Sequence, residues 1–455
     1  MPISKLVFAL GALLALLIVT LQPFETTLLN GALAIVLFAI SGWASGAIPE
    51  HLTALIFFLL AILSGIAAPA MVFSGFLTSA FWLVFAGIII GAAMKHTGLD
   101  TRLAHKLAHH APAQYGGLIA AIVIFGMVLA FLMPSSMGRA VLIVPLMQRL
   151  AQQMGYAVGS RGYIGILLAG AMGSFFPGFG ILPANVPNMV MVGAAESLYS
   201  WSPSYGGYLL LHFPLLGLGK SLLITGLITY FYHDKPTLPV MASQTERVPY
   251  TTSELRLALL LTLAIVLWVT DFAHGISPAW VGLGVAVFCL LPGARLVEGR
   301  TISQFNLSPL LYVAGIIGMG AVVAETGLGH LMAEKVLAFL PLSEDAPVVN
   351  WTNLSLGSVF MSLLTTQPGL PAVMSPLAQP LAEASGLELH TLLMIQVLGY
   401  STTILPYQAP PLVVAAQLGR IPFKDLIKMT FLLALLTLLL LVPLDILWWM
   451  LLGAL

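Results

Sequence analysis

The chain has 455 residues, of which 59% are hydrophobic and 7% are charged, and its formal net charge is zero. A soluble domain carries roughly a quarter of charged residues, so this composition predicts an all-α polytopic membrane protein instead. The neutral balance gives no sign of nucleic-acid binding.

Apolar runs bounded by Gly, Pro or charge predict about eleven transmembrane helices, at roughly 20 residues for each crossing, with the run 116–133 taken as one arm of a hairpin that does not cross. Long runs fall near 5–22, 31–48, 52–69, 80–94, 116–133, 161–182, 207–231, 255–272, 276–292, 308–324, 387–405 and 427–451. Runs too short to cross alone fall at 140–151, 188–195, 352–364, 371–382 and 410–418. We predict scaffold helices over 1–80, a first repeat over 81–206, scaffold helices with a cytoplasmic loop over 207–307, and a second repeat over 308–455.

Two polar clusters interrupt the apolar runs at matching places in the two halves. Pro134 to Arg139 reads Pro-Ser-Ser-Met-Gly-Arg, and Thr365 to Gly369 reads Thr-Thr-Gln-Pro-Gly. A break in a membrane helix survives only inside protein or beside a water-filled cavity. The clusters therefore predict the tips of two re-entrant hairpins, over 116–152 and 352–386.

The placement of Lys and Arg supports these hairpins. With the N-terminus cytoplasmic and both hairpins returning to their own side, Lys335 alone lies outside. The cations that fall inside are Lys5, Lys95, Arg102, Lys106, Arg149, Arg161, Lys235, Arg247, Arg256, Arg295, Arg300, Arg420, Lys424 and Lys428. This bias predicts a protein of a bacterial-type inner membrane with its C-terminus outside.

The two halves also repeat a sequence pattern. Phe85-Ala-Gly-Ile-Ile matches Val313-Ala-Gly-Ile-Ile, and each is followed by Thr-Gly-Leu and a short amphipathic segment. The charge count puts the two segments on opposite sides, which predicts inverted repeats of the kind found in secondary transporters.

A second pair of breaks contains proline. Leu182-Pro-Ala-Asn-Val-Pro-Asn188 lies in the first half and Leu405-Pro-Tyr-Gln-Ala-Pro-Pro411 in the second. Proline removes a backbone donor and clashes with the preceding turn, so both segments predict helices broken within the membrane, with a simple kink as the alternative. Freed carbonyls can hold a cation, and the next half-helix N-terminus can attract an anion.

This order of elements resembles the divalent anion–sodium symporter family, which transports dicarboxylates, citrate or sulfate. Ser135-Ser136-Met137 and Thr366-Gln367-Pro368 stand where the family carries a Ser-Asn-Thr motif at each tip. Val186-Pro187-Asn188 and Ala409-Pro410-Pro411 stand at its two broken helices. The resemblance implies a homodimer whose transport domain moves against a fixed scaffold, and uptake of the anion with sodium. Neither tip keeps the family's Asn or the Thr that follows it.

The expected site lies at the tips and breaks. Substrate-binding residues are expected to be Ser135, Ser136, Arg139, Asn188, Thr366, Gln367 and Pro410. Sodium is expected at Ser135, Ser136, Gly138, Asn185, Thr365, Thr366, Gln367 and Gln408.

Three charges are expected at membrane depth. An arginine there costs about 3 kcal/mol and pairs with carboxylate or sulfate through two parallel hydrogen bonds, so Arg139 is hypothesised to contact the anion. A snorkelling or structurally paired arginine is the alternative. Lys220 and Asp445 are predicted to snorkel to the interface rather than to relay protons.

The predicted function is secondary active transport of a small di- or tricarboxylate or sulfate-like anion, by an elevator-type mechanism. The expected partners are the anion, the lipid bilayer and a second copy of the chain, and no cofactor is expected besides sodium as the coupling ion. A cation/proton antiporter is the alternative, but it needs a titratable carboxylate at the midplane, which neither hairpin core provides. An intramembrane enzyme is a remote alternative, because no histidine falls near Ser135 or Ser136. The choice of anion, of sodium or proton, and of symport or exchange stays open.

Overall fold

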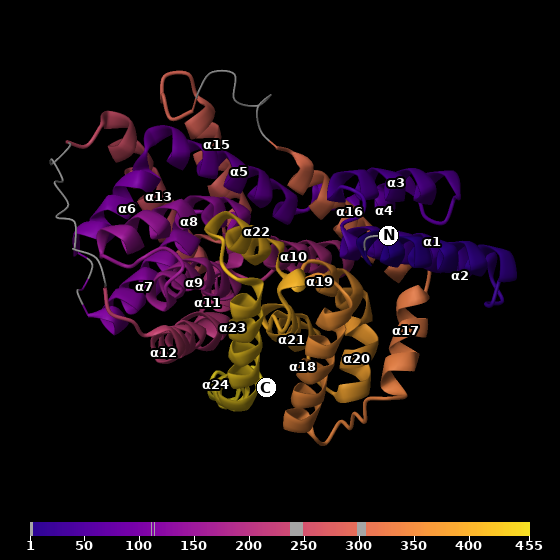
Figure 1. The fold of residues 1–455 in the computed structure, drawn as a ribbon. Helices are drawn as coiled ribbons and strands as arrows, with labels where there is room; N and C mark the ends of the chain where they lie inside the picture. Colours follow the sequence, from indigo (N-terminus) through magenta and orange to yellow (C-terminus); the bar gives the residue numbers. More distant parts are fainter. Residues whose placement is uncertain (1–2, 111, 113, 237–248, 298–305) are drawn as a thin grey trace.

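The computed structural model describes all residues except 1–2, 111, 113, 237–248 and 298–305 (Figure 1). Every regular element in this described part is helical, which confirms the all-α polytopic class. Eight of the described helices are long and apolar enough to cross a membrane, and five shorter ones are apolar as well.

The chain begins with a group of apolar helices that lie together in Figure 1. They are α1 (Ile3–Leu21), α2 (Thr27–Ser45), α3 (Glu50–Leu63), α4 (Pro69–Val72) and the 3-10 turn η1 (Ser74–Leu77). Helix α2 contacts α1 and α3, and α3 packs on α16 (Ser308–Glu325) of the second half. Gly75 approaches the backbone of Ala314 so closely that an added Cβ would lie 2.3 Å from its carbonyl oxygen. The amino-terminal group is therefore joined tightly to the second half.

In the first half, two helices joined by a turn occupy the residues predicted as a re-entrant hairpin, and an interrupted helix follows them. The elements of this half are α5 (Ser79–Thr97), α6 (Leu99–His110), the hairpin arms α7 (Tyr115–Leu132) and α8 (Ser136–Gln153), then α9 (Arg161–Phe175), η2 (Phe176–Gly180), η3 (Leu182–Ala184) and α10 (Val186–Tyr199). Helix α9 ends at Phe175, whereas the apolar run predicted it to reach 182. Pro177 is the physical reason, because it lacks the N–H that would continue the ladder.

A second group of helices lies between the two halves in the sequence. It consists of α11 (Tyr205–His212), the π-helical turn η4 (Phe213–Gly219), α12 (Lys220–Tyr232), α13 (Thr252–Val269), α14 (Asp271–His274) and α15 (Pro278–Leu290). Residues 205–232 form one long span that contains the π-helical turn.

The second half repeats the order of the first. After α16 come α17 (Leu328–Leu337), the hairpin arm α18 (Pro347–Leu364), then α19 (Gly369–Met374), η6 (Ser375–Leu377) and α20 (Ala378–Ser385), which together form the returning arm. The second broken helix comprises α21 (Leu389–Ser401), η7 (Pro406–Gln408) and α22 (Pro410–Gly419). The last span is α23 (Phe423–Leu436), the π-helical turn η8 (Thr437–Leu441) and α24 (Val442–Leu451). In Figure 1, α10 of the first half and α19, α21 and α22 of the second half lie near the middle of the view.

Small residues bring each hairpin against the broken helix of its own half. A Cβ added to Gly126 of α7 would lie 2.6 Å from the backbone of Gly173 and Ser174 in α9. A Cβ added to Gly399 of α21 would lie 2.5 Å from the hydroxyl of Ser358 in α18. Close approach of this kind drives packing between membrane helices, where lipid provides no hydrophobic force. The span over 161–180 is 94% buried and is the innermost of the eight.

Candidate anion and cation site

The first hairpin tip is a short extended turn between α7 and α8. Met133 has φ −123° and ψ 99°, and Ser135 has φ −145° and ψ 104°. Ser135 is the N-cap of α8, since its hydroxyl accepts a hydrogen bond from the N–H of Gly138 at 3.1 Å. The Ser135 oxygen therefore satisfies one of the free donors of the first helical turn. The sequence at this tip is polar because an N-cap is needed where the helix restarts.

Arg139 is fully buried one turn beyond this tip. Its Nε donates to the carbonyl of Ser174 at 2.8 Å, and its Nη1 donates to the carbonyls of Ala184, at 2.9 Å, and Met133. Its Nη2 donates to the hydroxyl of Ser136 at 3.2 Å. The guanidinium thus ties the tip to both sides of the broken helix. Four of its five N–H groups have acceptors in the protein, so two parallel bonds to an anion are not available in this conformation.

Two asparagines hold the first break open and leave polar atoms without partners. Asn185 caps α10 through Oδ1, which accepts the N–H of Asn188 at 3.0 Å. Asn188 donates from Nδ2 to the carbonyls of Gly178, Phe179 and Ile181 at 3.2, 3.4 and 2.9 Å. The Nδ2 of Asn185 and the Oδ1 of Asn188 are buried without a hydrogen-bond partner. Buried polar groups are almost always satisfied, so an unpaired donor and an unpaired acceptor here call for a ligand or water.

The second tip is held by the second break. Thr365 is extended, with φ −134° and ψ −179°, and its hydroxyl donates to the carbonyl of Thr366 at 2.6 Å. Gln367 donates from Nε2 to the hydroxyl of Thr403 at 2.6 Å, and its N–H donates to the carbonyl of Gln408 at 3.4 Å. Gly369 begins α19 where a Cβ would lie 2.6 Å from the Thr365 hydroxyl.

Gln408 satisfies the backbone on both sides of this break. Its Oε1 accepts the N–H groups of Ile404 and Leu405, each at 2.9 Å. Its Nε2 donates to the carbonyl and hydroxyl of Ser362 at 2.9 and 3.0 Å. Pro410 follows at the first position of α22, where its missing N–H costs nothing. The predicted cation ligand Gln408 is therefore already fully bonded within the protein.

The two halves interleave around these breaks. Helix α8 of the first hairpin packs on α22, and α10 packs on α19 of the second hairpin. Phe179 of the first break contacts Tyr400 of α21, with ring centroids 5.9 Å apart. The hydroxyl of Tyr199 in α10 donates to the carbonyl of Ser375 at 2.7 Å. The predicted residues thus lie in two separate hydrogen-bond networks, one around Arg139 and one around Gln408. The helices that carry the two networks pack against each other.

The structure contradicts the snorkelling predicted for Lys220 and Asp445. Lys220 is 0% exposed and Asp445 is 1% exposed. The ammonium of Lys220 turns inward to the carbonyl and hydroxyl of Ser401, at 2.6 and 2.9 Å. A lysine snorkels only when its side chain can follow an apolar surface to water, and here the end of α21 covers it.

Sequence reasoning missed the partners that hold the predicted residues. Ser174, Ala184 and Met133 bind Arg139 through backbone carbonyls, which carry no sequence signal. Thr403 and Ser362 bind the two glutamines. The adjoining threonines at 402 and 403, just before Pro406, were the one available hint of a polar break.

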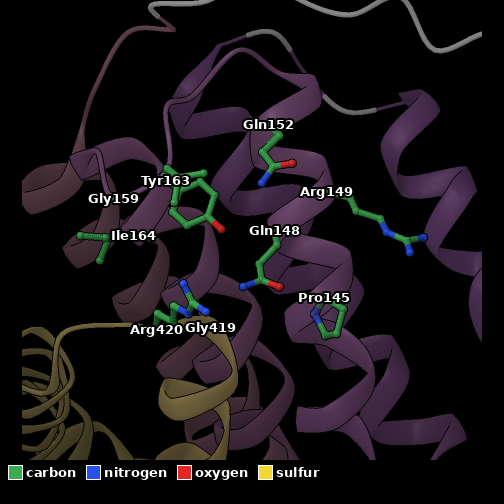
Figure 2. A pocket seen from close by; sticks show the side chains of 10 residues that line it. Pro145, Gln148, Arg149, Gln152, Gly159, Tyr163, Ile164, Gly419 and Arg420 are labelled. Carbon is green, nitrogen blue, oxygen red and sulfur yellow. The ribbon is translucent and has the colours of Figure 1, made fainter.

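An open pocket lies at the other end of α8 (Figure 2). It has a volume of about 620 Å³ and is lined by Pro145, Gln148, Arg149, Gln152, Val158, Gly159, Tyr163, Ile164, Gly419 and Arg420. Arg149 is 13 residues beyond Ser136 on the same helix, which corresponds to about 20 Å. The pocket is therefore separate from the tip and presents two arginines to solvent.

Known proteins share both the sequence and the fold. The family described as "Sodium:sulfate symporter transmembrane region" matches residues 4–455. An "Uncharacterized transporter" of Haemophilus influenzae is 22% identical, over 98% of this chain and 97% of that protein. An "L-tartrate/succinate antiporter" of Escherichia coli (strain UTI89 / UPEC) is 25% identical, over 82% and 79%.

Another relative and a solved structure are also similar to this chain. A "Sodium-dependent dicarboxylate transporter SdcS" of Staphylococcus saprophyticus is 20% identical, over 91% of this chain and 86% of that protein. The solved YdaH transporter of Alcanivorax borkumensis has a TM-score of 0.53 at 17% identity, covering 88% of this chain and 89% of that one, and so shares the fold. The family and the named relatives are transporters and not enzymes. The resemblance in element order is thus confirmed, and the chain belongs to the sodium:sulfate symporter family of divalent anion transporters.

Proposed function

We propose that this secondary anion transporter carries a small di- or tricarboxylate or a sulfate-like anion across the inner membrane, coupled to sodium. The observation that carries the site assignment is the unpaired buried donor of Asn185 beside the unpaired acceptor of Asn188. An elevator-type motion, a homodimer and a cytoplasmic N-terminus belong to the same proposal. They are supported by the family and by the two hairpins, each packed on a broken helix.

The proposed anion position lies where three helices begin. Helices α8, α10 and α22 all start at a tip or a break, so their dipoles favour negative charge there. Helix α22 adds no free N–H group, because it begins with Pro410 and Pro411 and the next two N–H groups bond to the carbonyl of Ala409. The Nδ2 of Asn185 and the remaining N–H of Arg139 add donors. Gly178 lies close to both donors, because a Cβ there would lie 3.0 Å from Nη2 of Arg139 and 3.7 Å from Nδ2 of Asn185.

The cation positions differ between the two halves. Around the first tip, three carbonyls and one hydroxyl surround the guanidinium of Arg139, and such oxygens are also the ligands that hard cations take. We infer that Arg139 supplies a fixed positive charge at this tip and that sodium binds at the second tip, through oxygens of Thr365, Thr366 and Gln367.

This feature also favours a second candidate function, anion exchange without sodium. A fixed guanidinium offsets the anion's charge while the anion is bound and is left uncompensated once the anion leaves. The emptied carrier would therefore return only after it binds another anion. A relative that is named an antiporter of tartrate and succinate is consistent with this candidate.

Proteoliposomes test both candidates. We expect the purified protein to catalyse counterflow of labelled succinate, citrate or sulfate. We also expect concentrative uptake with sodium in the external buffer and none when choline takes its place. Sodium-independent counterflow with no concentrative uptake would support exchange in place of symport. No counterflow of any dicarboxylate, tricarboxylate or sulfate would contradict the assignment of the anion.

A further inference from the structure

A second buried polar cluster lies apart from the tips, between α12, α21 and α24. Lys220 begins α12, Ser401 ends α21 and Asp445 lies in the first turn of α24. The Lys220 ammonium binds the last carbonyl of α21, where the helix dipole favours a cation. The cluster is therefore built around a half-helix end within the membrane.

Asp445 faces this cluster with fewer partners than a buried carboxylate needs. The charge of Lys220 acts on it, and the Nε1 of Trp449, one turn further along α24, lies near enough to interact with it. Neither Oδ1 of Asp445 nor Nε1 of Trp449 has a hydrogen bond of normal geometry. Within the described residues, the one ion pair closer than 4.0 Å is Arg102 with Glu254, so Asp445 and Lys220 are not in direct contact. A buried ion costs several kcal/mol unless close pairing and hydrogen bonds compensate. Asp445 in its neutral, protonated form needs no cation nearby to compensate it.

A π-helical turn precedes each of the two charges. The turn η4 ends at Gly219, just before Lys220, and η8 ends at Leu441, four residues before Asp445. The two turns contact each other. Turns of this kind are rare, and they occur frequently at functional sites. Their pairing here shows that both helices are irregular at the level of the charges.

Other titratable groups on the packed elements fall into two sets. His212, Tyr208 and Tyr400 join the cluster, because His212 lies 5.9 Å from the Trp449 ring and Tyr208 lies 3.5 Å from the Tyr400 hydroxyl. His212 is 1% exposed and its Nδ1 also lacks a partner. The remaining groups lie toward the ends of their helices and are Tyr115, Arg161, Tyr163, Glu196, Tyr199, Tyr205, Tyr230, Tyr232, Glu383, His390, Lys424, Asp425 and Lys428.

These remaining groups are too distant to compensate the pair. Arg161 bonds to Phe231 and Asp425 bonds to Tyr232, and Tyr232 is 12 residues, or about 18 Å, from Lys220 along α12. His390 stacks on Trp201, 11 residues before Ser401. Among the described residues, Lys220 and His212 are therefore the basic groups of the cluster, and Tyr208 and Tyr400 are its other titratable groups.

We propose that Asp445, opposite Lys220, is a proton-binding site that takes up and releases one proton in each transport cycle. The step is simple protonation: a solvent proton binds a carboxylate oxygen of Asp445, and the acid later returns it to water. The proposal rests on the transport function proposed above and adds a second coupling ion to it. The tip and the proton site are connected, because Ser401 is two residues from Thr403, the partner of Gln367. A movement of this break changes the partners of Lys220 and with them the field at Asp445.

Proteoliposomes without sodium test the coupling. We expect an inward proton gradient to drive concentrative uptake of whichever labelled anion, succinate, citrate or sulfate, gives counterflow at equal pH. In Asp445→Asn, the ratio of proton-driven uptake to counterflow should fall at least tenfold. The matched control is Asp271→Asn, which removes another buried carboxylate that bonds to the Tyr205 backbone in a different helix. Its ratio should stay within about twofold of wild type, and the ratio corrects for any loss of folded protein. An unchanged ratio in Asp445→Asn would overturn the proposal.

A spectroscopic measurement separates this proposal from the transport function. Infrared difference spectra of the purified protein should contain a carboxylic-acid C=O band that grows as pH falls and is missing in Asp445→Asn. Its absence from the wild type across the pH range in which the protein is folded would refute proton binding. If the band is present while no anion is transported, the transport proposal fails and the proton site stands.

Discussion

Replacing Arg139 with glutamine tests whether the first tip is held by a buried guanidinium. The substitution removes the bonds from Arg139 to the carbonyls of Met133, Ser174 and Ala184. Each buried carbonyl that loses its donor costs about 1–3 kcal/mol, or about 3–9 kcal/mol for three. Relief of the buried charge returns several kcal/mol, and the glutamine amide can restore part of the bonding. We expect a net loss of about 2–4 kcal/mol in the free energy of unfolding.

Tryptophan fluorescence can follow thermal unfolding of the purified protein in detergent, because the chain contains eight tryptophans. The expected order of midpoints is Arg139→Gln lowest, Arg139→Lys next, and wild type highest, since lysine keeps the charge but not the planar fork. Arg149→Gln is the matched control on the same helix, where an exposed side chain lines the open pocket, and it should change stability by less than about 0.5 kcal/mol. If Arg139→Gln unfolds at the wild-type temperature, water replaces the guanidinium at these carbonyls and the tip is not dry.

Three further predictions concern the contacts that position the site. Gly126→Leu should lower the unfolding midpoint strongly and reduce counterflow, because its side chain would enter the backbone of α9; Gly226→Leu, at a glycine with open space around it, is the control and should have little effect. Asn188→Ala removes the donor to three carbonyls of the first break, so we expect a loss of about 2–3 kcal/mol together with weaker anion binding, measured by thermal shift with and without anion; unchanged binding would remove Asn188 from the site. Glu254→Gln removes the carboxylate charge and one of the two oxygens that accept from Arg102, at 2.7 and 2.9 Å, where α6 joins α13, and we expect a loss of about 1–3 kcal/mol in the free energy of unfolding. That loss should shrink in high salt, and a loss independent of salt would show that packing, not charge, joins the two helices.

Much of the fold could be predicted because local rules decide it. Apolar runs of membrane length, interrupted by the polar clusters at 134–139 and 365–369, located the turn between α7 and α8 and the turn between α18 and α19 within a few residues. Proline located both breaks, although Pro177 ends α9 earlier than the run of apolar residues suggested. No pattern in the sequence marked η4 or η8, because a π-helical turn differs from its neighbours only in hydrogen bonding.

What the sequence by itself determined was the set of membrane helices, their interruptions and the polar residues at those interruptions, since these depend on hydrophobicity and on backbone chemistry. Only the tertiary structure decided what each polar group does. Arg139 binds carbonyls from α9 and η3, and Lys220 binds Ser401 from the other half of the chain, 181 residues away. A buried charge takes whichever partners the packed helices bring to it, and that choice is made between elements distant in sequence.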